Sequence, residues 1–117
     1  MVNKILLLIT SLVFSVDLTP LNYEEETKQG VVVVEYWATW NTKNMVGVIT
    51  ELESVKIARV NICENADLMV KHDIVVVPTI IFYNKGKEIN RLEGDLSFTL
   101  KTTKEELQKI VEVYYER

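Results

Sequence analysis

The stretch Glu35-Tyr36-Trp37-Ala38-Thr39-Trp40-Asn41-Thr42-Lys43-Asn44 decides the fold of this chain. Four consecutive valines precede it, so an apolar β-branched run leads directly into a polar segment. Because this run does not alternate with polar residues, it predicts a strand over residues 31–36 that is covered on both faces. Beyond the polar segment, apolar residues recur at the spacing of one helix face, at Met45, Val48, Ile49 and Leu52. We therefore expect a buried strand followed by an amphipathic helix that begins near Asn41.

Strands and helices alternate along the rest of the chain. Apolar or β-branched runs predict strands over residues 16–19, 55–62 and 75–83, and a polar edge strand is predicted over residues 88–93. Helices are predicted over residues 23–29, 66–72 and 104–114. Helices that lie between buried strands imply crossover connections and a sheet with helices on both faces. The turn Asn84-Lys85-Gly86-Lys87 adds an antiparallel edge, so we expect an α/β fold with a mixed sheet.

Three polar residues stand where helices are predicted to begin. Asn22 with Glu25, and Thr103 with Glu106, have the spacing of a capping box. Asn65 is predicted to cap the short helix that follows it. We expect all three side chains to accept hydrogen bonds from the first free N–H groups of their helices.

Composition excludes several classes of function. The 117 residues are 48 % hydrophobic, which suits one globular domain, and the net charge is −4 with a pI near 5.0. Because Lys and Arg are scattered, no nucleic-acid-binding surface is predicted. Cys63 is the single cysteine and His72 the single histidine, so an intrachain disulfide and a cysteine-based zinc site are excluded. We expect no metal and no cofactor.

Residues 1–15 allow two interpretations. Lys4 precedes a nearly continuous apolar run from Ile5 to Phe14, as in a short secretory signal peptide. The alternative is an N-terminal extension that forms a buried first strand. The run is too short for a membrane span, which needs about 20 apolar residues. The folded domain is expected over residues 16–117, in the secretory pathway or endoplasmic reticulum lumen if a leader is cleaved and in the cytoplasm otherwise.

Five local matches, in this order, resemble the thioredoxin and protein disulfide isomerase superfamily over roughly residues 16–115. They are the segment 35–40, the tetrapeptide 41–44, Ala58-Arg59-Val60-Asn61, Val77-Pro78-Thr79, and Gly86 followed by Gly94. The resemblance implies a thioredoxin fold with a cis-proline, Pro78, before a central strand. It also implies a Cys-x-x-Cys motif after Trp40, where this chain has Asn41-Thr42-Lys43-Asn44.

The asparagines remove the reaction that the resemblance implies at this site. The nucleophile of disulfide exchange is a thiolate at a helix start, stabilised by free N–H groups and the helix dipole. Asn41 cannot be that nucleophile, and Asn44 cannot be the resolving thiol. We expect Asn41 to cap the helix instead, which stabilises it by about 1 kcal/mol relative to alanine.

Glu35 and Arg59 match an acidic residue and its basic partner in the isomerase branch of the superfamily. There the glutamate is implicated in proton transfer to a cysteine. Without that cysteine the predicted role is a buried or half-buried ion pair, because removing one partner of such a pair typically costs about 3–5 kcal/mol. A proton relay is the alternative.

Pro78 and its neighbours are predicted to form a peptide-binding groove. A proline within a buried β-branched run cannot donate a ladder hydrogen bond, and the resemblance implies a cis bond that leaves the backbone of Val77 exposed. In relatives this backbone pairs with an extended peptide, and Thr79 completes that wall of the groove. Trp40 either contacts the peptide or packs as a lid over the helix start. Lys43 is expected to be solvated, or to select acidic partners.

The main functional hypothesis is a redox-inactive thioredoxin-like module that binds a protein or an extended peptide in this groove. The alternative is a thiol-disulfide oxidoreductase. It would act through Cys63 as a monothiol, or be an inactivated variant of a parent with cysteine at positions 41 and 44. A third hypothesis is a structural subunit of a larger assembly, and the oligomeric state stays open. Cys63 is expected to lie away from the groove as an incidental thiol, and His72 on the surface.

Overall fold

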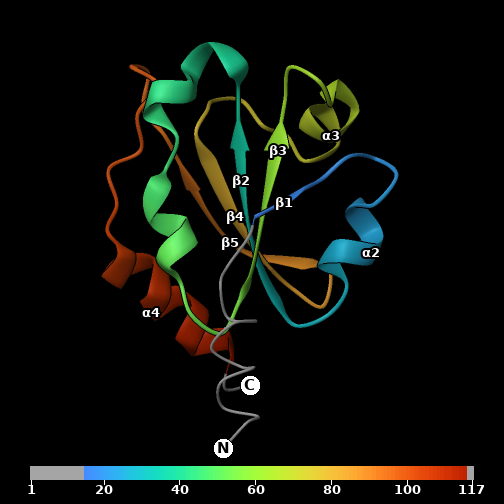
Figure 1. Cartoon of the computed structure of the whole chain (residues 1–117), viewed down its shortest axis with the longest axis vertical. Helices are drawn as coiled ribbons and strands as arrows, with labels where there is room; N and C mark the ends of the chain where they lie inside the picture. Colours follow the sequence, from blue (N-terminus) through green and yellow to red (C-terminus); the bar gives the residue numbers. More distant parts are fainter. Residues whose placement is uncertain (1–14, 116–117) are drawn as a thin grey trace, which may run out of the picture.

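The computed structural model describes residues 15–115, which form a twisted central sheet between two layers of helices (Figure 1). The five strands are β1 (Val16–Asp17), β2 (Val31–Trp37), β3 (Lys56–Asn61), β4 (Thr79–Asn84) and β5 (Lys87–Glu93). They lie in the order β1-β3-β2-β4-β5. β3 is parallel to both β1 and β2, whereas β4 is antiparallel to β2 and β5. The predicted α/β fold with a mixed sheet is confirmed.

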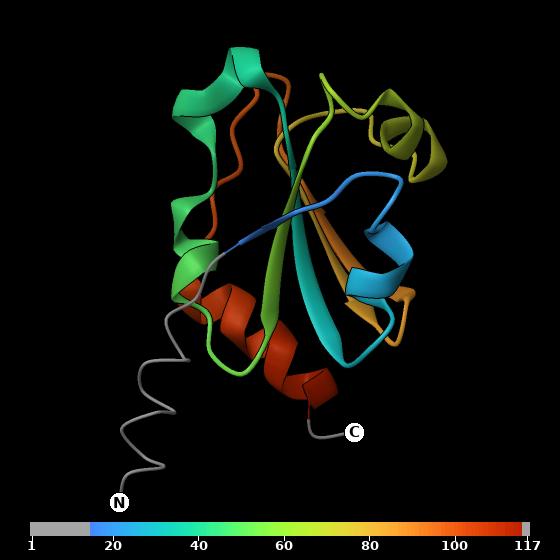
Figure 2. The ribbon, with the colours of Figure 1, turned by 45° about the vertical axis from the view of Figure 1, so that its right-hand side comes forward.

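Short helices cover both faces of this sheet (Figure 2). One face packs against α2 (Tyr23–Thr27) and α3 (Ala66–Lys71), whose buried contacts are Tyr23 and Leu68. The other face packs against the 3₁₀ helix η2 (Gly47–Glu51) and against α4 (Lys104–Tyr115). A second 3₁₀ helix, η1 (Thr39–Asn44), follows the end of β2.

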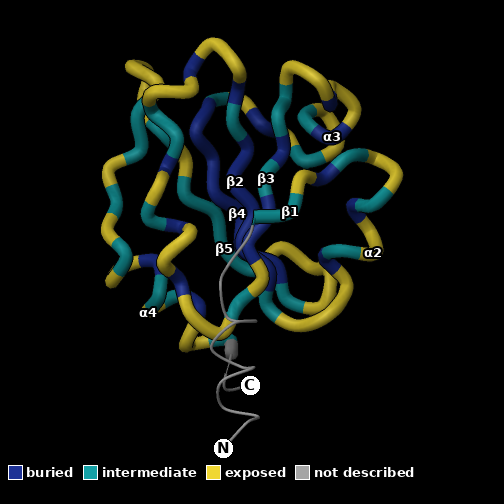
Figure 3. The backbone as a smooth tube through the Cα atoms, in the orientation of Figure 1, coloured by how far each residue is buried: buried dark blue, intermediate teal, exposed yellow. Residues whose placement is uncertain are grey.

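β2 is the most deeply buried strand of the sheet. The side chains of Val32, Val34 and Tyr36 point to the α2/α3 face, while that of Val33 points to the η2/α4 face. The central residues of β2 are dark blue in Figure 3, which marks them as buried. Coverage on both faces explains why the strand shows no alternation in the sequence.

The prediction of an amphipathic helix after Asn41 is wrong. η1 and η2 replace it, and Met45 and Val46 between them have non-helical backbone angles. The Glu35 carboxylate accepts a hydrogen bond from the N–H of Val46 at 2.7 Å, so this N–H is not available for a hydrogen bond within a helix. Gly47 and a run of β-branched residues further disfavour an α-helix. The spacing between Ile49 and Leu52 also fits a 3₁₀ helix, in which residues i and i+3 lie on one side.

Two of the three predicted helix caps are also wrong, because neither side chain accepts a hydrogen bond from its helix. The Asn22 side chain accepts from the N–H of Thr19 and donates to the carbonyl of Asp17, so it stabilises the preceding turn. Asn65 stands at the start of α3 but donates to the carbonyl of Asn61. These side chains bond upstream backbone groups instead of the helix N–H groups, as short polar side chains often do.

The third cap holds as predicted. The hydroxyl of Thr103 accepts from the N–H of Glu106 at 3.1 Å and donates to its carboxylate at 3.2 Å. The turn before β5 is also confirmed, with Lys85 and Gly86 both in the left-handed region at φ of 53° and 84°. These angles suit the turn type that joins two antiparallel strands through two residues.

The signal peptide or strand extension predicted over residues 1–15 lies outside the described residues except for Ser15. Within residues 15–115, every helix is too short or too polar to cross a membrane.

Candidate functional site

η1 presents the segment 39–44 at the end of β2. Trp40 is 60 % exposed, Lys43 is exposed, and Asn41 is only 5 % exposed. Asn41 interrupts the helix, since its φ of −121° and ψ of 26° are not helical. The segment therefore places one large aromatic side chain on the surface and turns one amide side chain inward.

The predicted capping role of Asn41 is wrong. Its Nδ2 donates to the carbonyl of Phe98 at 3.0 Å, and its Oδ1 accepts from Nδ2 of Asn44 at 2.8 Å. Both ends of the amide are thus used, one across the fold and one within η1. Asn41 ties η1 to a loop that follows β5.

That loop, residues 94–99, was not predicted to belong to the site. The ring of Phe98 lies edge-on to that of Trp40, with the ring centroids 5.0 Å apart. Gly94 donates its N–H to the carbonyl of Pro78 at 2.8 Å. The loop therefore joins the two parts of the chain that the sequence assigned to the groove.

Asp95 holds the loop together. Its Oδ1 accepts hydrogen bonds from the backbone N–H groups of Ser97, at 2.9 Å, and Thr99, at 3.2 Å. Hydrogen bonds from Ser97 and Thr99 lower the pKa of Asp95 to about 2. The sequence contains a signal for this loop, because an aspartate followed by serine and threonine at these spacings is typical of an Asx turn, which an aspartate side chain closes by accepting from backbone N–H groups.

The Val77–Pro78 peptide bond is cis and directly precedes β4. Val77 is only 2 % exposed and Pro78 is buried, so the expected exposure of the Val77 backbone is wrong for this conformation. Among residues 15–115, no hydrogen-bond partner is found for the N–H or carbonyl of Val77. Thr79 is buried and donates its hydroxyl to the carbonyl of Val76. Val77 is buried because it packs in the core cluster on the α2/α3 face, so the groove wall predicted at these residues stays a prediction.

Glu35 and Arg59 meet beneath η1. Glu35 is fully buried, and its Oε1 accepts from Nε of Arg59 at 3.0 Å. Its Oε2 accepts from the N–H of Val46, whose carbonyl faces the Arg59 guanidinium. Burial raises the pKa of Glu35, while the Val46 N–H and Arg59 act to lower it. The pair fixes the junction between η1 and η2 to the sheet.

The side chain of Asn61 connects Cys63 to η1. Cys63 is exposed, and its N–H donates to Oδ1 of Asn61, whose Nδ2 donates to the hydroxyl of Thr39. Thr39 directly precedes Trp40. A single side chain therefore connects the backbone at Cys63 to the start of the candidate site.

The expected surface position of His72 is wrong. Its ring is half-buried among Tyr23, Tyr36 and Tyr83, with centroid distances of 4.6, 6.0 and 6.1 Å. The hydroxyls of Tyr36 and Tyr83 bond each other at 2.7 Å, and burial raises the pKa of both. Burial lowers the pKa of His72, and Lys71 adds to this effect. The cluster packs α3 against the sheet and lies on the α2/α3 face.

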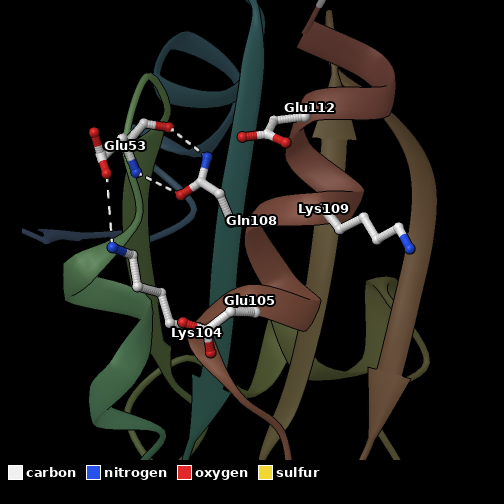
Figure 4. Close-up of a pocket in the computed structure, with 6 residues that line it drawn as sticks. All are labelled: Glu53, Lys104, Glu105, Gln108, Lys109 and Glu112. Carbon is white, nitrogen blue, oxygen red and sulfur yellow. Dashed lines mark hydrogen bonds and ion pairs between the residues drawn. The ribbon is translucent and has the colours of Figure 1, made fainter.

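A shallow hollow beside α4 offers a second location (Figure 4). It is lined by Glu53, Lys104, Glu105, Gln108, Lys109 and Glu112. Glu53 and Gln108 exchange two hydrogen bonds, and Lys104 lies 3.6 Å from the Glu53 carboxylate. Glu53, Lys104 and Gln108 thus bond one another and attach α4 to the segment before β3. Among residues 15–115, no three acidic, histidine or cysteine side chains are arranged to hold a metal ion.

The sheet order, the two helical layers and the cis-proline before β4 define a thioredoxin fold. Two solved structures share it. A single-site mutant of thioredoxin from Halobacterium salinarum NRC-1 has a TM-score of 0.73 at 18 % identity, covering 88 % of this chain and 92 % of that one. Thioredoxin from Malassezia sympodialis has a TM-score of 0.67 at 20 % identity over the same shares.

A family model described as Thioredoxin matches residues 14–112, and the chain therefore belongs to the thioredoxin family. Thioredoxin from Listeria monocytogenes is 25 % identical over 105 residues, which cover 84 % of this chain and 96 % of the relative. Thioredoxin from Staphylococcus haemolyticus is 28 % identical over 86 residues, covering 68 % and 83 %. Most of the domain is therefore similar to these relatives.

Proposed function

We propose that this chain is a redox-inactive member of the thioredoxin family that binds extended polypeptide at Trp40. The proposal places Asn41 and Asn44 at the positions of the family's two cysteines. Disulfide exchange needs a thiolate, which an amide side chain cannot supply. Because Cys63 is the single cysteine among the 117 residues, no pair of thiols within this sequence can cycle between dithiol and disulfide.

The bonding of Asn41 carries this proposal. Its amide connects Asn44 to the carbonyl of Phe98, so the side chains of Asn41 and Asn44 both take part in hydrogen bonds that stabilise η1 and its contact with the loop 94–99. Around them, Trp40, Phe98 and Leu96 expose apolar surface, by 60 %, 41 % and 94 %. Exposed aromatic side chains beside a rigid sheet end are frequent in polypeptide-binding sites. The site is therefore suited to recognition.

The comparisons favour a second candidate function, that of a thiol-disulfide oxidoreductase. The relatives named above are thioredoxins, and the chain spans most of their length. The exposed Cys63 is the group that would act, and Asn61 connects it to the start of η1. Its thiolate could attack a substrate disulfide, forming a mixed disulfide and releasing one substrate thiolate. A second thiol from the solution would then have to release the product.

Binding is tested with dye-labelled, carboxymethylated α-lactalbumin, an unfolded polypeptide without free thiols. Fluorescence anisotropy measures its Kd for the wild-type chain and for Trp40→Ala. The substitution should weaken binding about 10-fold or more, because a central aromatic contact is lost. Leu21→Ala is the matched control, since Leu21 is 98 % exposed and lies before α2. Equal affinity of wild type and Trp40→Ala would remove Trp40 from the site and contradict the proposal.

A further inference from the structure

Two aromatic rings from different parts of the chain meet at the candidate site. The loop 94–99 runs beside η1, as Figure 1 and Figure 2 both show. It brings the ring of Phe98 edge-on to that of Trp40, with the ring planes at 83°. Both side chains are still exposed after this contact. The pair therefore presents apolar surface in two nearly perpendicular directions.

The polar side chains beside this pair bond groups of the site itself. The Asn41 amide donates to a backbone carbonyl of the loop and accepts from another amide of η1. The Asp95 carboxylate accepts from the backbone N–H groups and the hydroxyls of Ser97 and Thr99. Apart from the charge of Lys43, the contacts that this surface leaves for a partner are therefore mainly apolar.

The direction of the Phe98 ring is set by a backbone conformation that needs support. Phe98 has a φ of 62°, in the left-handed region that a bulky aromatic residue rarely adopts, and it keeps this angle only where surrounding contacts impose it. Asp95 fixes the N–H groups of both neighbours of Phe98, those of Ser97 and Thr99. Asn41 fixes the carbonyl of Phe98 itself, at 3.0 Å. The contact between the two rings thus depends on Asp95 and Asn41.

We propose that Asp95 and Asn41 are positioning residues that fix Phe98 against Trp40, and that this aromatic pair selects polypeptide segments with bulky apolar side chains. The inference rests on the proposed function, because it names the substrate class of the same site. Since the loop is ordered beforehand, binding loses little conformational freedom. A bulky apolar side chain gains contact with both rings, whereas a small polar one gains neither an apolar contact nor a hydrogen-bond partner.

Three variants separate the ring from the residues that position it. Phe98→Gly removes the ring, and glycine adopts a φ of 62° without strain. Asp95→Ala removes the carboxylate, whereas Asp95→Asn keeps an oxygen that can accept from the two N–H groups. Val113→Ala is the control for the ring, because Val113 is a half-exposed apolar residue of α4. Glu25→Ala is the control for the carboxylate, because Glu25 pairs with Lys28 on the surface.

Two measurements follow the ring contact and the affinity. Nuclear Overhauser effects between the rings of Trp40 and Phe98 report the contact, and anisotropy gives the Kd for carboxymethylated α-lactalbumin. Phe98→Gly should weaken binding about 5- to 10-fold. Asp95→Ala should lose the ring-to-ring effects and weaken binding about 3-fold or more, while Asp95→Asn should keep the effects and bind within about 2-fold of wild type. Both controls should match wild type.

Competition tests the substrate class. A short Gly-Ser peptide with two central phenylalanines should displace the labelled polypeptide from the wild-type chain, and its match with two central serines should not. Wild-type affinity in Phe98→Gly or Asp95→Ala, weaker binding by Asp95→Ala with the ring-to-ring effects retained, or no advantage of the phenylalanine peptide would overturn the inference. If Trp40→Ala still binds more weakly than wild type, the proposed function survives that result. Equal affinity of wild type and Trp40→Ala would contradict the proposed function itself.

Discussion

Glu35 shows how one buried carboxylate shapes the candidate site. It accepts hydrogen bonds from the N–H of Val46 and from the guanidinium of Arg59, so the chain after η1 is fixed to β2 and β3. This structural role of Glu35 does not depend on a cysteine, unlike a proton relay. A carboxylate is useful inside the fold because these two donors would otherwise be left unpaired.

We predict that Arg59→Met lowers the free energy of unfolding by about 3–5 kcal/mol at neutral pH, because a buried charge loses its partner. Burial already raises the pKa of Glu35 above its ordinary 4.5, and losing Arg59 raises it further. An acid whose pKa is higher in the folded state than in the unfolded state contributes its full stabilisation at a pH below the unfolded-state pKa. That contribution is lost as the pH rises through the folded-state pKa. The deficit should therefore shrink between pH 7.5 and pH 5, as measured by urea unfolding.

Lys56→Met is the control for this prediction. Lys56 pairs with Glu26 at 3.1 Å on the surface, where such pairs contribute about 0–1 kcal/mol. A deficit for Arg59→Met that is equally small, or one that does not change with pH, would show that the buried pair does not hold this junction.

His72 gives a second pH-dependent prediction. Burial lowers its pKa below the ordinary 6.5, and Lys71 and Arg91 add to this, whereas Glu88 and Asp73 oppose it. The folded state therefore binds fewer protons than the unfolded state as the pH falls through 6.5, and stability is lost on acidification. The effect should be modest, because the ring is only half-buried and solvent screens it.

His72→Phe keeps an aromatic ring among the three tyrosines and removes the titration. Melting temperatures at pH 7.5 and pH 5.5 should fall more for wild type than for His72→Phe. An identical fall in both proteins would show that His72 stays unprotonated or is freely solvated in that range.

The sequence could suggest the residues of the site but not all of their partners. Trp40, Asn41 and Pro78 were identified from local motifs. The bond between Asn41 and Phe98 joins residues 57 positions apart, and no local pattern contains it. Asn41 was therefore expected to cap a helix, the nearest use for an amide at that position.

At the scale of elements, β2 and the turn before β5 were predictable because their causes are local. A continuous β-branched run defines the buried strand, and glycine in the left-handed region defines the turn. η1 and η2 were not predictable, since the interruption between them depends on Glu35, 11 positions before Val46. Apolar spacing alone could not distinguish their 3₁₀ turns from one α-helix.

The end of β5 provides a prediction at this scale. Gly94→Ala should lower the free energy of unfolding by about 1–3 kcal/mol, because the added Cβ would lie 3.0 Å from two backbone carbonyl oxygens. Gly47→Ala is the matched control, since a Cβ there has no neighbour within 4 Å and should be neutral or stabilising. Equal stability of the two variants, measured by urea unfolding, would contradict the close approach of the loop 94–99 to Pro78.

At the scale of the whole molecule, the domain has the fold of the thioredoxin family. The proposed difference from the family is confined to the side chains at the end of β2, where the loss of disulfide exchange is proposed. The mixed sheet, its two helical layers and the cis-proline are those of a thioredoxin fold, and the family match covers residues 14–112. The fold could be predicted because several local matches occurred in the right order. Function could not be transferred with it, because function depends on the side chains at the site.

The most direct test of the central proposal is the reduction of insulin by dithiothreitol, followed by turbidity, with catalytic amounts of this chain. A thioredoxin with two active-site cysteines serves as the positive control. We predict the same rate with and without the chain, because Asn41 and Asn44 cannot exchange disulfides and Cys63 has no second thiol in the sequence. Acceleration by the wild-type chain that disappears in Cys63→Ala would contradict the proposal and establish the oxidoreductase alternative.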